Sequence, residues 1–171
     1  IANPVEPFEV SLFATHTDTR SVTVSNNYAY VAEGLGGLRV IDIANPGAPT
    51  EVGFIDTPSY ALCVDVEMGL AYVAVGDSGL QVINVANPSA PFDVGSFDTP
   101  GHASSVAILD NFAYVSDGDS GLRVIDISIS EAPFEVSSFS TSDVAYAVAV
   151  LGNFAYVVGH NFGLIIVDVS D

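Results

Sequence analysis

The sequence repeats itself every 42 residues, and this repeat constrains the fold more than any other feature. Ala-Tyr-Val occurs at residues 29–31, 71–73, 113–115 and 155–157, and Gly-Leu follows at 37–38, 79–80, 121–122 and 163–164. No insertion or deletion interrupts the spacing. A fixed period of roughly 20–50 residues is the signature of solenoids, propellers and other repeat arrays. The chain is therefore expected to build one structural unit four times.

Each repeat reads as four short strands separated by turns. In the second repeat, apolar runs near residues 60–66, 70–74, 79–85 and 92–97 alternate with breakers rich in glycine, proline and asparagine. This density of breakers leaves no window for an amphipathic helix. The runs show little polar alternation, which is typical of strands buried on both faces. We therefore predict an all-β chain, in which each repeat is one four-stranded blade of a β-propeller.

The register defines the blades of a single β-propeller domain, or part of one, over residues 1–171. Complete blades are expected near 18–56, 60–98 and 102–140, whereas the fourth runs from 144 to 169 with three strands. The missing outer strand is found at the other end, because residues 8–13 align with the outer strands at 92–97 and 134–139. Since an unpaired apolar edge invites aggregation, we expect residues 8–13 to complete the sheet that residues 144–150 lead.

Three arrangements satisfy this expectation. Closure within one chain gives a four-bladed ring, which requires a steep turn of about 90° per blade. Exchange between two chains gives a homodimer, an eight-bladed ring with a two-fold interface. A longer chain that supplies further blades is the third arrangement. We favour more than four blades in the complete ring.

The strand after Gly-Leu carries the residues by which the chain resembles a known family. Gly-Leu-Arg-Val-Ile-Asp-Ile occurs at residues 37–43 and 121–127, followed in the first case by Asn45-Pro46. These segments, with Ala-Tyr-Val and the Gly-Asp-Ser-Gly turns, resemble the LVIVD repeat. The resemblance implies a β-propeller of a bacterial or archaeal protein that is extracellular or on the cell surface. It implies no activity, because the family shares no catalytic motif.

Charge excludes several classes of partner. The chain has 21 acidic residues against three arginines, and its formal net charge is −18. Such a surface repels phosphate backbones and anionic lipids, so neither nucleic acid nor a membrane surface is expected as a partner. The most apolar stretch, residues 144–158, is broken by Gly152-Asn153 and is too short to span a bilayer. We therefore expect no membrane insertion.

Positions at which the repeats differ are the candidates for ligand binding. The start of the innermost strand carries Asp18, Tyr60, His102 and Val144 in successive repeats, and two residues later Arg20 and Tyr146 appear. The loops after the second and fourth strands of each blade open on one face, and all three histidines lie there. The candidate ligand-binding residues are therefore His16, Asp18, Arg20, Tyr60, His102, Tyr146 and His160.

The Gly-Asp-Ser-Gly turns suggest two kinds of chemistry. They resemble the nucleophile segment of trypsin-like proteases, but they occur twice in register between strands, and Asp, Ser and Gly are what a tight turn requires. We expect no catalytic residue. The main interpretation is solvated turns, with a site for a hard cation such as Ca²⁺ as the alternative. The candidate metal ligands are Asp77, Asp117, Asp119 and Asn161.

These observations lead to one principal hypothesis about function. We expect a non-enzymatic binding or scaffold module, without a required cofactor, that presents variable loops on a rigid propeller to a protein or glycan partner. The alternative is an enzyme or metal-dependent ligand-binding propeller, with its site on the face that carries the histidines and aspartates. The absence of a complete catalytic constellation favours the first hypothesis.

Overall fold

Four antiparallel sheets, one for each 42-residue repeat, make up the computed structural model, which describes residues 6–170. The first sheet contains β1 (Ser21–Ser25), β2 (Tyr28–Ala32), β3 (Leu38–Asp42) and β4 (Thr50–Ile55). The second contains β5 (Cys63–Glu67), β6 (Leu70–Ala74), β7 (Leu80–Asn84) and β8 (Phe92–Phe97). The third contains β9 (Ser105–Leu109), β10 (Phe112–Ser116), β11 (Leu122–Asp126) and β12 (Phe134–Phe139). The fourth contains β13 (Ala145–Leu151), β14 (Phe154–Gly159) and β15 (Gly163–Asp168).

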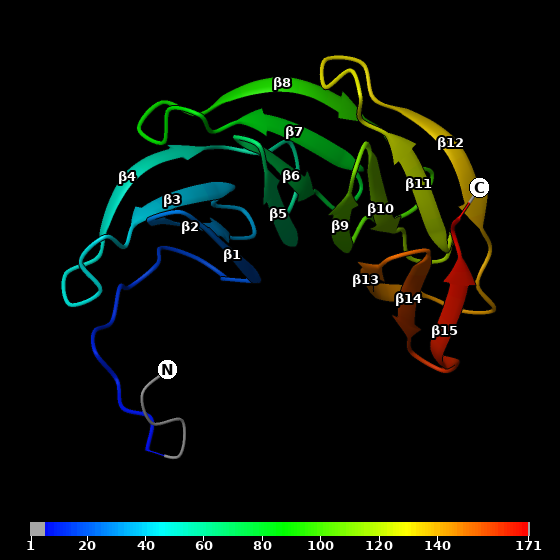
Figure 1. Ribbon diagram of the computed structural model, residues 1–171, viewed down its shortest axis with the longest axis horizontal. Helices are drawn as coiled ribbons and strands as arrows, with labels where there is room; N and C mark the ends of the chain where they lie inside the picture. Colours follow the sequence, from blue (N-terminus) through cyan, green and yellow to red (C-terminus); the bar gives the residue numbers. More distant parts are fainter. Residues whose placement is uncertain (1–5, 171) are drawn as a thin grey trace.

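The sheets follow one another along an arc, as the blades of a propeller do (Figure 1). Within each sheet the strands pair in sequence order. Their first strands, β1, β5, β9 and β13, lie on the inside of the arc, and β4, β8 and β12 lie on the outside. The predicted all-β propeller architecture of four repeats is therefore confirmed. Among residues 6–170 no helix is long and apolar enough to cross a membrane.

Consecutive sheets pack face to face through apolar side chains. The leading face of a sheet contacts the following sheet, and in the first sheet it carries Tyr30, Ala32, Leu38 and Val40. The trailing face contacts the preceding sheet, and in the second sheet it carries Val64, Ala71, Val73 and Ile83. The same pairing recurs at the next two interfaces. Fully burying one such side chain stabilises the fold by about 1.5–3 kcal/mol, so these three interfaces form the core.

Backbone bridges between neighbouring sheets add to this packing. Gly34 pairs with Ala61, Gly76 with Ala103, and Gly118 with Ala145. Each bridge joins the turn after a second strand to the start of the next sheet. The three glycines have φ of +49°, +56° and +58°, a region that glycine enters without steric cost. The bridges therefore fix the loops of one sheet against those of the next.

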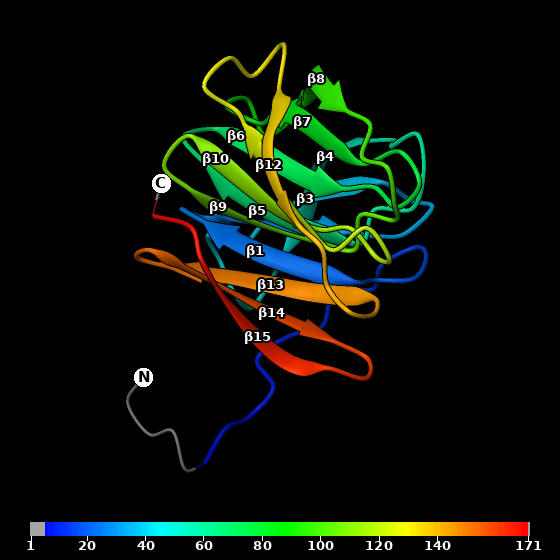
Figure 2. The same cartoon turned by 90° about the vertical axis from the view of Figure 1, so that its right-hand side faces the viewer.

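Within residues 6–170 the sheets do not close into a ring. The fourth sheet has three strands, and β15 is its free edge (Figure 2). Residues 8–13 form no strand, and Ser11 Oγ instead donates a hydrogen bond to the Pro46 carbonyl oxygen at the first sheet, 2.6 Å away. The expected same-chain completion of the last blade is therefore absent here. The physical reason is curvature, because four sheets do not turn far enough to bring the N-terminal segment to β15 (Figure 1).

Candidate functional site

The turns after the second strands and the connections between sheets gather on one side of the arc, called here the loop face. The three backbone bridges join these two kinds of loop across each interface. All seven candidate ligand-binding residues belong to these loops or to the strand starts beside them. The loop face comprises residues 14–20, 33–37, 56–62, 75–79, 98–104, 117–121, 140–146 and 159–163.

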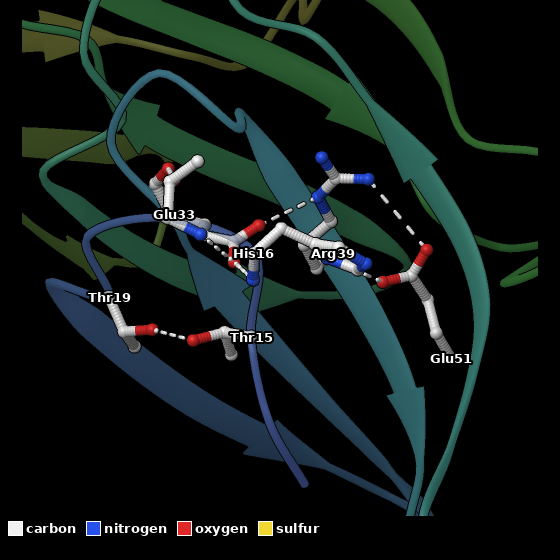
Figure 3. Close-up of polar contacts among 7 residues, drawn as sticks. Thr15, His16, Thr19, Glu33, Arg39 and Glu51 are labelled. Atoms are coloured by element: carbon white, nitrogen blue, oxygen red, sulfur yellow. Dashed lines mark hydrogen bonds and ion pairs between the residues drawn. The ribbon is translucent and has the colours of Figure 1, made fainter.

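A buried carboxylate holds the loop face at the first sheet. Glu33, directly after β2, is fully buried. It accepts hydrogen bonds from the backbone N–H groups of His16 and Thr17, the latter at 2.8 Å (Figure 3). Arg39 Nε donates to the other carboxylate oxygen at 2.9 Å. Glu33 therefore fixes the connection that carries two of the predicted site residues, His16 and Asp18.

Arg39 is enclosed from three directions. Besides Glu33, its guanidinium pairs with Glu51 at 3.7 Å, and it lies 4.6 Å from the centre of the Phe54 ring. Burial alone raises the pKa of Glu33, but the hydrogen bonds from Thr17, His16 and Arg39 together outweigh it and hold that pKa below its usual value. The buried pair is therefore ionised at neutral pH.

The third sheet repeats this arrangement with a shorter acid. Asp117, also fully buried, accepts hydrogen bonds from Thr99 Oγ1 at 2.5 Å and from the Gly101 N–H at 2.9 Å. Arg123 Nε lies 3.5 Å from it, an ion-pair distance, and Arg123 Nη1 lies 3.3 Å from Glu135. Burial raises the pKa of Asp117 in spite of these partners. The carboxylate of Asp117 therefore binds groups of the protein itself, whereas the sequence suggested Asp117 as a candidate cation ligand.

The second sheet lacks both members of this ion pair. Successive repeats carry Glu33, Val75, Asp117 and Gly159 at the acid position, and Arg39, Gln81, Arg123 and Ile165 at the arginine position. Acid and arginine are present or absent together. Physical chemistry explains the pairing, because a buried charge without its partner is strongly destabilising.

A hollow of about 730 Å³ lies at the second sheet, lined in part by the side chain that replaces the arginine. Gln81 is buried and donates a hydrogen bond to Asp93, while its Oε1 has no partner. Ser96 stands where the first sheet has Phe54, so no ring covers this position. We call this site the acidic hollow, and its defining residues are Asp56, Asp77, Gln81, Asp93, Ser96 and Asp98.

A second hollow of about 380 Å³ lies between the third and fourth sheets and is lined by His102, Ser104, Asp119 and Tyr146. His102 Nδ1 lies 2.7 Å from Asp77 Oδ1, so this pair stands between the two hollows. Ser104 Oγ donates to the Tyr146 carbonyl oxygen at 2.9 Å and joins the two sheets. The structure thus brings together His102, Tyr146, Asp77 and Asp119 from the sequence-predicted set.

The remaining predicted ligand residues lie elsewhere on the loop face. Arg20 and Asp18 form an exposed ion pair of 2.5 Å at the first sheet, where His16 lies 3.9 Å from Glu51. At the other end of the arc, Tyr146 Oη and His160 Nδ1 are 3.5 Å apart. Tyr60 lies between these ends, beside Gly34. The predicted set is therefore spread along the arc.

The candidate metal ligands are also dispersed. Asp77, Asp119 and Asn161 occupy equivalent turns of three different sheets, and Asn161 donates a hydrogen bond to Asp143. Within residues 6–170, no three His, Cys, Asp or Glu side chains gather as a group that could hold a metal ion. Calcium binding stays a prediction.

Sequence reasoning missed Glu33, Gln81 and Asp93. The signal was available, since comparing the four repeats at the acid and arginine positions shows that the second repeat has lost a charged pair. The sequence could not show that Gln81 and Asp93 of the second repeat line a hollow.

Comparison with known proteins gives a family and a fold. The model of the LVIVD repeat matches residues 17–57, 60–99, 100–141 and 144–171. No curated protein matches the chain. The crystal structure of the computationally designed Ika4 protein superimposes with a TM-score of 0.76 at 13% identity, covering 96% of this chain and 99% of that one. The computationally designed Ika8 protein gives 0.72 at 12% identity, covering 88% of this chain and 46% of that one.

Proposed function

The chain belongs to the LVIVD-repeat family, and from this premise we propose that it is a non-enzymatic binding module whose loop face holds a cationic group of a protein partner. The observation that carries the proposal is the acidic hollow. At the equivalent place in the first and third sheets, the chain supplies its own arginine. In the second sheet it supplies Gln81.

The first sheet indicates what the acidic hollow would recognise. There a guanidinium is held between two carboxylates and an aromatic ring. The second sheet keeps the carboxylate of the outer strand, Asp93, and Asp77 and Asp98 also line the hollow. A guanidinium matches carboxylates through paired hydrogen bonds, and an ammonium does so as a point charge. An arginine or lysine side chain is therefore the ligand group that this hollow suits best.

The overall charge supports the same class of partner. At −18 the protein attracts basic surfaces over a distance and raises the rate at which they associate. This attraction is not specific by itself, because salt screens it beyond a Debye length of about 8 Å at physiological ionic strength. The specificity of the proposed interaction therefore comes from the acidic hollow. Membership of the LVIVD-repeat family supports a location of this protein outside the cell or on the cell surface.

The test uses a small cation and its neutral isostere. Acetyl-arginine methylamide and the matching citrulline compound are titrated into the full chain at about 150 mM salt, with backbone amide shifts as the readout. We expect the arginine compound to shift amides around Asp77 and Gly95 and the citrulline compound to have little effect. Ser96→Arg, at an exposed residue that lines the hollow, places an internal guanidinium there and should weaken binding at least about tenfold, as expected for a lost charge-assisted hydrogen bond.

Ser138→Arg is the matched control. It adds the same charge at the position of the third sheet that is equivalent to Ser96, away from the hollow. This variant should bind the arginine compound within about twofold of the unchanged chain, because salt screens the added charge. Equal weakening by both variants would show general charge attraction and would contradict the proposal, as would equal binding of citrulline.

A further inference from the structure

The leading face of the fourth sheet is exposed, although its equivalents are buried. Leu38, Leu80 and Leu122 are each 0% exposed, because the next sheet covers them, whereas Leu164 at the same position is 57% exposed. Ile166 is also 57% exposed, and its first-sheet equivalent Val40 is fully buried. The fourth sheet thus carries the apolar side chains that bind a following sheet.

The trailing face of the first sheet shows the converse. Val64, Val106 and Val148 are between 3% and 9% exposed against the preceding sheet, but Val22 at the same position is 59% exposed. Two residues later, Val24 is 62% exposed. The first sheet therefore carries the side chains that bind a preceding sheet.

The outer strands of the two end sheets are complementary in the same way. In the first three sheets the third strand pairs with a fourth, whereas β15 has no such partner in the described part of the chain. Residues 8–13 lie 42 positions before β4 (Thr50–Ile55), so they stand in the register of an outer strand. Three of their apolar side chains are exposed, because Phe8 is 83%, Val10 60% and Leu12 80% exposed. The strand that β15 lacks is available at the far end of the arc.

We propose that these two ends bind each other between two copies of this chain, so that two arcs close into one ring of eight sheets. At each of two identical seams, the leading face of one copy packs on the trailing face of the other. Residues 8–13 of each copy add to β15 of the other. The occupant is a second copy because the matching trailing face is this chain's own, and the curvature of one arc keeps its two ends apart (Figure 1). A two-fold assembly gives β15 and both exposed faces of each copy a partner.

The seam also completes the loop face. His160 stands in the register of Gly34, Gly76 and Gly118, which lie against the start of the next sheet. Asp18 of the second copy stands in the register of Tyr60 and His102 at that start. Closure of the ring therefore places His16, Asp18 and Arg20 of one copy beside Tyr146 and His160 of the other copy. Candidate residues that are separated within one chain become neighbours.

The first experiment measures mass in solution by light scattering. The full chain is expected to have twice the 17.7 kDa of one copy. Leu164→Asp changes an exposed residue, so each arc should stay folded by circular dichroism while the mass falls to that of one chain. The control is Met68→Asp, which changes a residue 93% exposed in a turn where the third repeat already has Asp110. It should leave the mass unchanged.

The second experiment tests the register of the seam. Arg39 pairs with Phe54 across β3 and β4, so Ile165 of one copy should pair with Leu12 of the other. In a Cys63→Ser background, which matches Ser21 and Ser105 of other repeats, oxidised Leu12→Cys/Ile165→Cys should form a covalent dimer. Neither single variant should do so. A folded chain that is strictly monomeric overturns the proposal, as do open polymers larger than two copies.

Discussion

Glu33 and Asp117 occupy equivalent positions, yet their surroundings shift the two pKa values in opposite directions. Burial raises both, but the hydrogen bonds that Thr17, His16 and Arg39 give to Glu33 leave its pKa below the usual value. At Asp117 burial prevails. Ionised Glu33 therefore stabilises the fold at neutral pH, whereas ionised Asp117 is held at a cost.

The first prediction compares Glu33→Gln with Asp117→Asn at neutral pH. Glu33→Gln leaves partly buried Arg39 with only Glu51 and should lower the free energy of unfolding by about 3 kcal/mol, the scale of a broken buried ion pair. Asp117→Asn leaves Arg123 with only Glu135, but it also removes a charge that burial disfavours, so it should cost less, about 1 kcal/mol. Urea denaturation of the two variants measures the difference. Equal losses, or a milder effect of Glu33→Gln, would contradict the assignment.

The same two residues give opposite pH dependences. Because the pKa of folded Glu33 is lowered, its stabilisation is fully present above the unfolded value near 4.5 and is lost as pH falls through the folded pKa. Because the pKa of folded Asp117 is raised, the folded state takes up this proton first, and stability rises as pH falls from the folded pKa toward 3.8. The destabilisation caused by Glu33→Gln should therefore shrink in acid only below about pH 4.5.

At the scale of the strand, the 42-residue pattern was enough to place most elements. The apolar run at 70–74 corresponds to β6, and the run at 92–97 corresponds to β8. The first strand was expected from residue 60, but β5 begins at Cys63, because Ala61 is engaged in a bridge with Gly34 of the preceding sheet. Such a contact joins different repeats, so local apolar periodicity does not reveal it.

In the turn that contains Gly79, one added methyl group is expected to lower the stability of the fold strongly. Gly79 has φ of +74°, and a Cβ there would lie 2.3 Å from the Phe97 carbonyl oxygen and 2.4 Å from the Thr99 nitrogen. Gly79→Ala should therefore destabilise the fold by about 2 kcal/mol or more, through backbone strain and a clash.

Gly47→Ala is the control for this prediction. Its nearest neighbour would be Asn45 Oδ1 at 3.5 Å, and its φ lies outside the left-handed region. It should change the free energy of unfolding by less than about 0.5 kcal/mol, as surface substitutions usually do. Thermal or urea unfolding of both variants provides the comparison, and similar values would refute the strain argument.

At the scale of the whole molecule, the sequence predicted four sheets but not how far they turn. The angle between neighbouring sheets depends on side-chain packing at each interface rather than on any local pattern. For this reason the same-chain ring is one of three arrangements compatible with the sequence, and the seven candidate ligand residues expected on one face are spread along an open arc. His102 and Tyr146 share a hollow because their sheets are neighbours. His16 and His160 belong to the first and last sheets, and only closure would unite them.

The last prediction follows from the nearest-neighbour character of repeat proteins, in which each unit is stabilised by the units beside it. Leu80→Ala removes a side chain that is 0% exposed at an internal interface and should cost about 2–5 kcal/mol. Leu164→Ala changes the equivalent residue at the free end, which is 57% exposed. In a chain kept monomeric by Val22→Asp, it should cost less than about 1 kcal/mol, because little burial is lost. With Val22 restored, closure of the ring covers Leu164, and the cost should rise toward that of Leu80→Ala. A cost for Leu164→Ala that is small in both backgrounds would show that nothing packs against the fourth sheet.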